Sequence, residues 1–509
     1  MRLATTLTFI LLGSTAANAQ TSRDMALTPS LETRQAIEAI TPRNEGSSKS
    51  PRAFKELKID SKTGRPSNES TNSGADGTVA IAAQDTMIVQ FQPDTTQSQI
   101  DDYVKVNKFE VVKTFPTLGA VQIRTDLSRF FQPKLTDNSA NDAVIRGLLD
   151  ASAQFKKDPR VREATPDLVL RGQADVANFM IATNVADQTD ATRLDWGIKD
   201  IEADQLWALE GASDGAIFGV MDVGFGRHRN LVYIDLLNST PIEDHGTHVS
   251  GIACGRVKEA TGINGVIPNC LIRARYGDVF FESVQPGQVT KFFALFSQIL
   301  ASLTSFVDSF DDVSVFNISL GYNWISNFGI NPDNPESSQW RSLVEIQGPL
   351  LVTLLQNAEK KGKIIFSAAG NDSAGLTPPI DAKYASPFNW AAITARELGI
   401  KSGVIVEAHD KLGKRAPFSN TGGHISCPGV NILSTVAFNA QRQPTKSAYG
   451  EMSGTSMASP YCSSGLVLFR LVQKNYSGQE ALECILASGV KSDSGVPMLK
   501  LKAALAKCP

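Results

Sequence analysis

One serine in this chain stands where a helix could present a nucleophile. Ser456 follows Gly454, which permits a tight backbone turn, and precedes an apolar run typical of a buried helix. Unpaired backbone N–H groups at a helix N-terminus suit a developing oxyanion. Small residues of this kind are also typical of an ordinary helix cap. Chemistry at Ser456 therefore depends on partners elsewhere in the chain.

Two candidate partners come earlier in the sequence. Asp222 ends the continuous apolar run 216–221, which predicts a buried parallel strand with a carboxylate at its C-terminal end. His245 begins a predicted helix. A serine hydroxyl is a poor nucleophile until a base takes its proton. His245 would be that base and then the acid, and Asp222 would hold the imidazole and stabilise its protonated form.

Asn371 follows a predicted strand at 363–369. Its side-chain amide could donate to a tetrahedral oxyanion, with the Ser456 N–H as the second donor. The alternative is a simple turn residue after Gly370.

Two other kinds of site fit the spacing poorly. His245 and His248 are three residues apart, whereas zinc-binding helices more often carry histidines four apart with a Glu between them. No third ligand is nearby, so we predict no metal. An α/β-hydrolase esterase needs Gly-x-Ser-x-Gly and the order Ser, Asp, His. Thr455 and Met457 flank the serine, which comes last, so this reaction class is excluded.

The elements that must position these residues alternate along the chain. Strands are predicted at 216–221, 271–275, 313–320 and 363–369, and a helix at 350–360. This alternation implies an α/β fold in three layers, with a mostly parallel sheet between helices.

Four motifs in one order resemble the subtilisin-like serine peptidase family, the subtilases, over about residues 195–490. They are Asp222-Val223-Gly224, His245-Gly246-Thr247-His248, Ala369-Gly370-Asn371 and Gly454-Thr455-Ser456-Met457-Ala458. The resemblance implies a catalytic set of Asp222, His245, Ser456 and Asn371, in the subtilisin order Asp, His, Ser. It implies polypeptide substrates and no required cofactor.

The resemblance also implies a substrate-binding surface. Ser319, Leu320 and Gly321 look like the edge with which an extended peptide pairs as an added strand. The opposite wall of the pocket would be formed by Ala368, Ala369 and Gly370. The alternative is ordinary sheet at both places.

This sequence departs from the family pattern in two ways around the catalytic motifs. Val223 stands where the family usually has a residue that can donate to Asp222, and the interval from Asp222 to His245 is shorter than usual. Structural calcium is possible, since many subtilases bind it. The turn 256–264 offers only Glu259 as an acidic ligand, whereas calcium needs six to eight oxygens, so no calcium site can be placed.

A small domain is predicted at 86–171. Its elements follow the order strand, helix, strand, strand, helix, strand, typical of an open-faced α+β sandwich. It contains no Cys and no His, which argues against catalysis and favours a binding or chaperoning role. Its order and position resemble the inhibitory propeptide of the subtilases, so we expect it to act as an intramolecular inhibitor and folding aid.

Composition and the N-terminus indicate an exported protein. Arg2, an apolar run at 7–12 and Ala17-Asn18-Ala19 predict a signal peptide cut before Gln20, and no later run predicts a membrane span. A net charge of −3 gives no electrostatic case for nucleic acid. Six cysteines predict disulfides, with fifteen pairings open and Cys254–Cys270 as the local choice.

The predicted organisation has five parts. They are a signal peptide at 1–19, a polar and disordered segment at 20–85, the propeptide-like domain at 86–171, a linker with the maturation site at 172–194, and the peptidase domain at 195–509. We expect a monomer in the periplasm, the cell envelope or the outside medium.

These residues and motifs leave two functions open. The first is a secreted, self-processing serine endopeptidase. The alternative is a catalytically silent subtilase-like protein that uses its cleft to bind peptides. Trp324 and Trp340, in the polar stretch 323–345, either pack on the protein's own surface or line the cleft wall.

Overall fold

A computed structural model describes most of the chain. The described residues are 56–60, 66–67, 78–127, 130, 140–172, 195–238, 240–256, 262–276, 280–281, 292–322, 324–325, 330–438 and 443–509. All of them belong to one compact unit, 51–509. The predicted signal peptide and most of the predicted linker lie outside the described residues.

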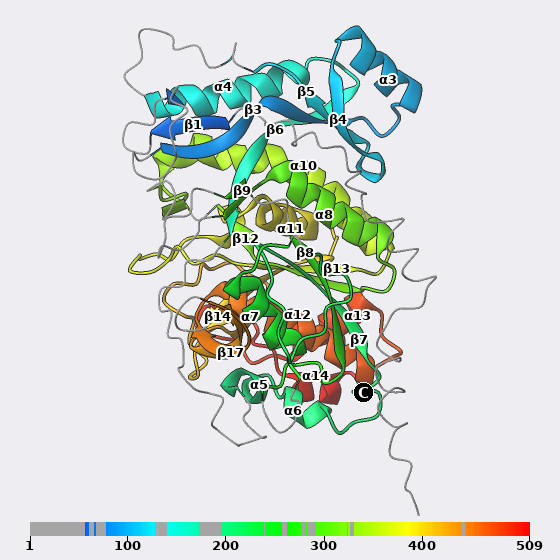
Figure 1. Ribbon diagram of the computed structural model, residues 1–509, viewed down its shortest axis with the longest axis vertical. Helices are drawn as coiled ribbons and strands as arrows, with labels where there is room; N and C mark the ends of the chain where they lie inside the picture. The colour runs from blue at the N-terminus through cyan, green and yellow to red at the C-terminus, as the bar shows by residue number, and fades with distance from the viewer. Residues whose placement is uncertain are drawn as a thin grey trace, which may run out of the picture. The chain divides into compact units, whose positions relative to one another are not determined.

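A parallel sheet forms the centre of the larger part (Figure 1). Its six described strands run in the order β15-β14-β13-β11-β7-β8, with every neighbouring pair parallel. Their bounds are Ala216–Asp222 for β7, Cys270–Tyr276 for β8, Val315–Ile318 for β11, Ile364–Ala368 for β13, Gly403–His409 for β14 and Ile425–Pro428 for β15.

Alternate side chains of these strands enter two separate cores. Ile365 and Ile405 pack with the helices α8 (Phe296–Ser309), α10 (Ser338–Lys360) and α11 (Pro387–Glu397). Their neighbours along the strands, such as Phe366, join the opposite core. That core contains α7 (Asp244–Cys254), α12 (Thr455–Val472), α13 (Gly478–Ser488) and α14 (Leu501–Lys507). This arrangement confirms the predicted three-layer α/β fold.

Two short helices and one hairpin complete the part of the chain from residue 195 onward that surrounds the central sheet. The helices α5 (Trp196–Asp200) and α6 (Ala203–Leu206) precede β7. The strands β16 (Ile432–Phe438) and β17 (Pro444–Met452) form an antiparallel hairpin that leads into α12.

The predicted small domain forms an antiparallel sheet with two helices. Its elements are β3 (Thr78–Phe91), α3 (Gln97–Val106), β4 (Glu110–Phe115), β5 (Ala120–Arg124), α4 (Ala140–Phe155) and β6 (Val161–Gly172). Their order is the predicted one. Met87, Ile123 and Ala164 of the sheet share a core with Ile100 of α3 and Phe155 of α4.

The strand β6 also joins a part of the chain more than a hundred residues away. Its C-terminal end pairs antiparallel with β10 (Phe292–Leu295) and with β12 (Leu320–Gly321). β10 pairs in turn with β9 (Phe280–Phe281). Because of these pairings, the sheet of the small domain continues into the strands beside α8.

Two sequence predictions were wrong in extent. The helix predicted at 350–360 begins at Ser338 and contains Pro349 in its interior. A proline inside a helix destabilises it, but Trp340 before Pro349 and Leu350 after it are buried in the same core, which favours one continuous helix. The segment 20–85 also contains β1 (Glu56–Asp60), β2 (Pro66–Ser67) and the first part of β3, which pair with one another.

All six cysteines lie in the described residues and form disulfides, as the even count predicted. The pairs are Cys254–Cys270, Cys427–Cys462 and Cys484–Cys508. The local pairing predicted from the sequence is therefore confirmed. In the described part of the chain no helix has the length and apolar character needed to cross a bilayer.

A buried carboxyl links β6 to the N-terminus of α8. Asp167 is fully buried and accepts hydrogen bonds from the Ser297 backbone N (2.8 Å) and hydroxyl (2.6 Å) and from Gln122 Nε2 (2.9 Å). Burial raises the pKa of Asp167 to about 6 from 3.8, and these hydrogen bonds oppose the shift.

We predict that this contact weakens as pH rises. A carboxyl whose pKa is raised in the folded state stabilises it fully below the unfolded pKa and loses that contribution as pH rises through the folded pKa. Asp167→Asn should therefore gain stability relative to the parent, by up to about 3 kcal/mol, between pH 4 and pH 7. Urea unfolding of the full chain measures this, in a Ser456→Ala background because the sequence predicts self-cleavage.

Asp150→Asn is the matched control, because Asp150 is an exposed carboxyl on α4. A stability difference that is the same at pH 4 and pH 7 for Asp167→Asn would contradict the prediction.

Candidate functional site

Parallel strands bring the candidate residues to one edge of the sheet. Asp222 is the last residue of β7, and Asn371 follows β13 by three residues. β11 lies between these two strands and is parallel to both, so their C-terminal ends meet at the same edge. The helix α12 packs against β7, β11 and β13, and Ser456 is its second residue.

The carboxylate of Asp222 holds His245 with both oxygens. His245 Nδ1 donates to Asp222, at 2.8 Å from Oδ1 and 2.9 Å from Oδ2. Asp222 is 1% exposed and His245 is 4% exposed, so solvent competes little for the bond. A proton fixed on Nδ1 leaves Nε2 of the neutral ring as a proton acceptor.

A backbone N–H donates to Asp222 in place of the side-chain donor that Val223 lacks. The sequence left in doubt how Asp222 is stabilised without a hydroxyl beside it. The Val223 N–H itself donates to Asp222 Oδ1 at 2.8 Å. The carboxylate therefore has a second donor that does not depend on the side chain at position 223.

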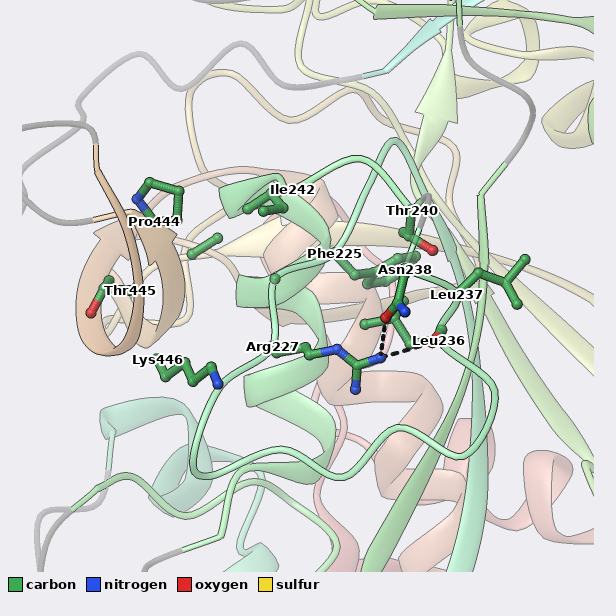
Figure 2. A pocket seen from close by; sticks show the side chains of 12 residues that line it. Phe225, Arg227, Leu236, Leu237, Asn238, Thr240, Ile242, Pro444, Thr445 and Lys446 are labelled. Atoms are coloured by element: carbon green, nitrogen blue, oxygen red, sulfur yellow. Dashed lines mark hydrogen bonds between the residues drawn. The ribbon is translucent and has the colours of Figure 1, made fainter.

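Close packing explains Gly246, the glycine that follows His245. A Cβ on Gly246 would lie 2.1 Å from the Gly224 carbonyl oxygen and 2.9 Å from Asp222 Cβ. The N-terminus of α7 can therefore approach the exit of β7 only with glycine at position 246. The chain between β7 and α7 then runs past Phe225 and Ile242, beside a cavity (Figure 2).

Thr455 fixes the orientation of Asn371. The Thr455 backbone N–H and hydroxyl both lie 2.9 Å from Asn371 Oδ1. Because the backbone N–H can only donate, the atom that faces it must be the carbonyl oxygen of the Asn371 amide. The amide nitrogen Nδ2 is then turned elsewhere, and a Cβ on Gly454 would lie 3.4 Å from it. A donor therefore stands beside the N-terminus of α12.

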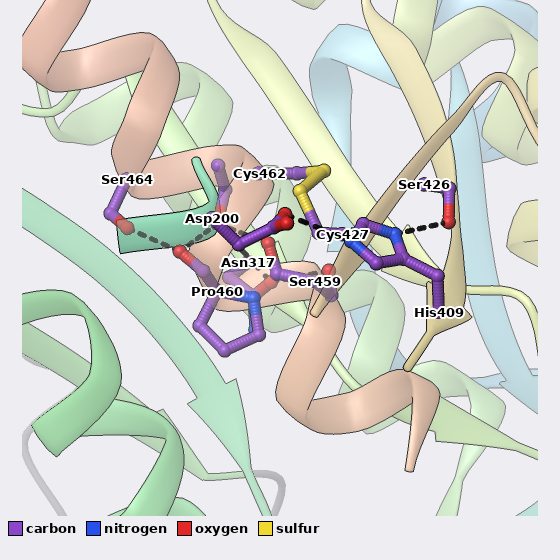
Figure 3. The surroundings of a disulfide bond; sticks show 10 residues. Asp200, Asn317, His409, Ser426, Cys427, Ser459, Pro460, Cys462 and Ser464 are labelled. Atoms are coloured by element: carbon purple, nitrogen blue, oxygen red, sulfur yellow. Dashed lines mark hydrogen bonds and ion pairs between the residues drawn. A yellow bond between two sulfur atoms is a disulfide. The ribbon is translucent and has the colours of Figure 1, made fainter. Parts of the chain in front are cut away.

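Polar contacts and a disulfide hold α12 in place (Figure 3). Ser459 Oγ donates to Asn317 Oδ1 of β11 at 2.6 Å, and Cys462 of α12 is bonded to Cys427 of β15. Every residue of α12 from Thr455 to Phe469 is buried. Sequence reasoning missed Asn317 and Thr455, because neither lies in a position that suggests chemistry by itself.

Ser456 Oγ and His245 Nε2 share one property. Both atoms are buried, and neither has a hydrogen-bond partner in the described part of the chain. Buried polar atoms without partners are few in native structures. Hydrogen bonds between reacting groups are often long in the absence of substrate. Two unpaired atoms at the two ends of the proton transfer predicted from the sequence fit a site that is completed by a substrate.

The second histidine of the His-Gly-Thr-His motif has a structural role. His248 Nε2 donates to the carbonyl oxygens of Ile432 (2.9 Å) and Gly450 (3.1 Å), which ties α7 to the β16–β17 hairpin. Burial lowers the pKa of His248 to about 3, so the ring is neutral. Among the described residues no three side chains of the His, Cys, Asp and Glu types form a group that could hold a metal ion.

A second Asp, His and Ser group lies elsewhere in the core. Figure 3 shows His409 between Ser426 and Asp200, with ring nitrogens 2.8 Å from Ser426 Oγ and 3.0 Å from Asp200 Oδ2. His409 is fully buried, and Lys500 also pairs with Asp200 at 2.9 Å. Because no substrate can reach the ring, this group joins α5 to β14 and β15 and has no access for chemistry.

The predicted substrate-binding residues stand at the C-terminal ends of the neighbouring parallel strands β11 and β13. Leu320 and Gly321 form β12, directly after Ser319, and pair with β6. Ala368, Ala369 and Gly370 lead from β13 to Asn371. Gly370 has φ 104°, and a Cβ there would lie 2.4 Å from Asn420 Nδ2. Asn420, which sequence reasoning also missed, holds this turn by donating from Nδ2 to the Ala369 carbonyl at 3.2 Å.

The two tryptophans pack inside the protein. Trp324 is 1% exposed, stacks on Tyr322 with ring centroids 4.5 Å apart, and donates from Nε1 to the Tyr384 carbonyl at 2.7 Å. Trp340 contacts Trp324 edge to face and is 8% exposed. These contacts favour the first alternative given above, in which both rings stabilise the protein itself.

The chain is similar to known proteins both in sequence and in fold. The family model described as "Subtilase family" matches residues 235–499, a range that contains His245, Asn371 and Ser456 but not Asp222. A "Thermophilic serine proteinase" of Bacillus sp. (strain AK1) is 28% identical over 279 residues, which is 52% of this chain and 55% of the relative.

Two further proteins are similar to this chain. An "Alkaline protease" of Alkalihalobacillus alcalophilus is 25% identical over 324 residues, 62% of this chain and 69% of the relative. The crystal structure of fervidolysin from Fervidobacterium pennivorans, described as a keratinolytic enzyme related to subtilisin, matches the fold with a TM-score of 0.53 and 20% identity. That match covers 84% of this chain and 61% of fervidolysin. The chain thus spans between half and two thirds of the Bacillus relative and of fervidolysin.

The pKa of His245 gives a first test of the site. Burial lowers the pKa of this imidazole, but the charge and hydrogen bond of Asp222 outweigh burial and hold the pKa above its ordinary 6.5. We predict that Asp222→Asn brings the His245 pKa below 6.5. Titration by NMR of ring-labelled protein measures both values.

His228 is an internal control in the same spectra. Burial lowers its pKa to about 4, and its ring bonds to the Ala448 carbonyl rather than to Asp222. A His245 pKa that does not move in Asp222→Asn would show that the carboxylate does not set the protonation of the ring.

Proposed function

The chain belongs to the subtilase family, and from this premise we propose that it is a serine endopeptidase that cuts polypeptides with Ser456. The observation that supports the proposal most is the bond from His245 Nδ1 to both Asp222 oxygens, at the sheet edge where α12 presents Ser456. This arrangement leaves a proton acceptor on the ring and a buried hydroxyl without a partner among the described residues.

The proposed reaction uses each group at one atom. His245 Nε2 takes the proton of Ser456 Oγ as the oxygen attacks the peptide carbonyl, and Asp222 stabilises the resulting imidazolium. The carbonyl oxygen becomes an oxyanion that accepts from Asn371 Nδ2 and the Ser456 N–H. His245 then gives its proton to the leaving amine. Water repeats the sequence on the acyl-enzyme and releases the product carboxylate.

We further propose that residues 86–171 inhibit the enzyme within the precursor. β6 lies between β10 and β12 and forms backbone pairs with both, as an extended substrate would on such an edge. Arg171 and Gly172 face Gly321 and Leu320, so β6 covers the proposed substrate edge. In the proposed maturation, cleavage soon after Gly172 releases this strand from the edge.

Three disulfides suit an exported protein, since such bonds persist in oxidising compartments. Together with the predicted signal peptide, they support secretion to the periplasm, the cell envelope or the medium. The proposed substrates are polypeptides, and the proposed active form is the monomer freed of residues up to the maturation site.

Replacing Ser456 tests the activity and the maturation together. Ser456→Ala should lower peptide hydrolysis by about 10⁴–10⁶-fold, because the nucleophile is lost while the fold is retained. The same variant should stay at full precursor length, whereas N-terminal sequencing of the parent should find a new terminus between Gly172 and Arg193. Both proteins are expressed in a host that lacks other proteases.

Ser459→Ala is not a suitable control, since Ser459 holds α12, but Ser447→Ala removes an exposed serine of β17 and should change neither result. Full hydrolysis by Ser456→Ala would rule out the proposed nucleophile. Trimming of Ser456→Ala at the parent's site would show that maturation is not self-cleavage.

Asn371 should act on the transition state. Asn371→Ala removes the amide that we assign to the oxyanion, so kcat should fall by about 10²–10³-fold with little change in KM. The melting temperature is measured alongside, because Asn371 also accepts from Thr455. A higher KM with unchanged kcat would show instead that Asn371 only positions the substrate.

A further inference from the structure

A cavity of about 280 Å³ lies between the chain that leaves β7 and the β16–β17 hairpin (Figure 2). Its lining includes Phe225, Arg227, Leu237, Thr240, Ile242 and Lys446. A cavity of about 150 Å³ is large enough to bind benzene. This cavity therefore has room for a large apolar side chain.

The walls of the cavity are mostly apolar and incompletely covered. Leu237 is 49% exposed and Ile242 is 47% exposed, although both are large hydrophobic residues. Thr240 is only 7% exposed, yet its hydroxyl has no hydrogen-bond partner in the described part of the chain. Adjacent exposed apolar side chains and an unpaired buried hydroxyl are typical of a surface that a ligand covers.

The charge at the cavity is positive. Arg227 and Lys446 are exposed, and no carboxylate is among the lining residues. Figure 2 shows the Arg227 guanidinium held by the Leu236 carbonyl (3.1 Å) and by Asn238 Oδ1 (3.4 Å). The two carboxylates next to lining residues in the sequence are engaged elsewhere: Asp235 pairs with Arg273 and Arg275, and Glu243 accepts from the backbone N–H of Asp244 at 3.1 Å. The rim therefore favours an acidic group on the ligand.

The cavity adjoins the candidate catalytic pair. Phe225 follows Asp222 by three residues, and Ile242 precedes His245 by three. Three residues span at most about 11 Å. The cavity lining therefore comes within about 11 Å of both Asp222 and His245 along the chain.

The direction of β6 indicates which half of a substrate would enter. β6 runs antiparallel to β12, so a chain that continues past Gly172 runs toward Ser319 and the C-terminal end of β11. The neighbouring strand β7 ends at the same edge, and the cavity begins directly after it. A substrate bound as β6 is bound would thus reach the cavity with residues that follow the cleaved bond.

We propose that this cavity receives an apolar side chain of the substrate from the C-terminal side of the cleaved bond, and that Arg227 and Lys446 select an acidic residue beside it. The proposal rests on the peptidase activity proposed above. It names a substrate class: polypeptides in which an apolar and an acidic residue follow the cleaved bond.

Matched peptides test this selectivity on the mature enzyme. All share one N-terminal half, and at each of the first three positions after the cleaved bond they carry Leu or Ala, with Asp or Lys as the neighbour. At one of these positions Leu should exceed Ala in kcat/KM by about ten-fold or more. Asp should exceed Lys by about two- to five-fold, an advantage that high salt should reduce.

Two variants with matched controls assign the effects to the cavity. Lys446→Gln should reduce the preference for Asp, whereas Lys502→Gln, at an exposed lysine of α14, should leave it unchanged. Leu237→Trp should fill the rim and lower the preference for Leu over Ala. Leu412→Trp, at an exposed leucine in a turn, should not.

The outcomes separate this inference from the proposed function. Hydrolysis that depends on Ser456 but is equal for all C-terminal halves would overturn the cavity's role and leave the peptidase standing. If no peptide is cut, the proposed function fails, and labelled C-terminal halves are then bound to Ser456→Ala protein and measured by fluorescence anisotropy. Tighter binding of the Leu-Asp peptide that Lys446→Gln weakens would support the cavity, and equal binding would overturn it.

Discussion

The parallel pairing of β7, β11 and β13 is the constraint on which the site depends. Parallel neighbours end at the same edge, so residues 222 and 371, far apart in the chain, are delivered to one place. The N-terminus of α12 packs across these strands and adds Ser456. A slip of one residue in this register would turn alternate side chains such as Ile365 and Phe366 toward the wrong core, so the cores also fix the site.

Polar groups around α12 are buried, and their partners specify its position. A buried polar atom without a partner costs free energy, so each pairing favours one placement of the helix over its neighbours. Ser459 with Asn317, Thr455 with Asn371, and Tyr461 with Asp195 connect α12 to three separate parts of the chain. In contrast, Ser456 Oγ and His245 Nε2 have no such partners among the described residues. Polar contacts thus hold α12 in place, whereas the Ser456 hydroxyl on this helix has no hydrogen-bond partner among the described residues.

The strand β6 joins two groups of strands into one sheet. In the small domain it pairs with β3, and beyond Leu168 it pairs with β10 and β12. Asp167 lies at the junction and accepts from the first turn of α8. A domain that folds onto α8 in this way carries its last strand directly to the edge beside Ser319. The pairing of β6 with β12 and the contact of Asp167 with α8 therefore belong to one continuous interaction.

The sequence by itself determined the fold class, the family and the identity of the candidate residues. Apolar runs that end in Asp222 or lead to Asn371, and glycines that permit close approach, are local patterns whose cause lies within a few residues. For the same reason the small domain's element order and the short-range pair Cys254–Cys270 were predictable. The start of α10 was not predictable from the sequence. A proline inside a helix, such as Pro349, usually interrupts it, and here the packing of Trp340 and Leu350 in one core favours a continuous helix.

Only the tertiary structure decided how these residues are held. The Val223 N–H on Asp222, Thr455 on Asn371 and Asn317 on Ser459 join residues through backbone geometry or across long sequence separations, for which no local pattern exists. The same is true of His409, whose Asp and Ser partners mimic a reactive group but lie in a closed core. The sequence gives the type of each side chain. The burial of a side chain and its distance from a partner arise only when segments that are distant in the sequence pack together. Burial and distance distinguish His409, whose two ring nitrogens both have partners, from His245, whose Nε2 has none among the described residues.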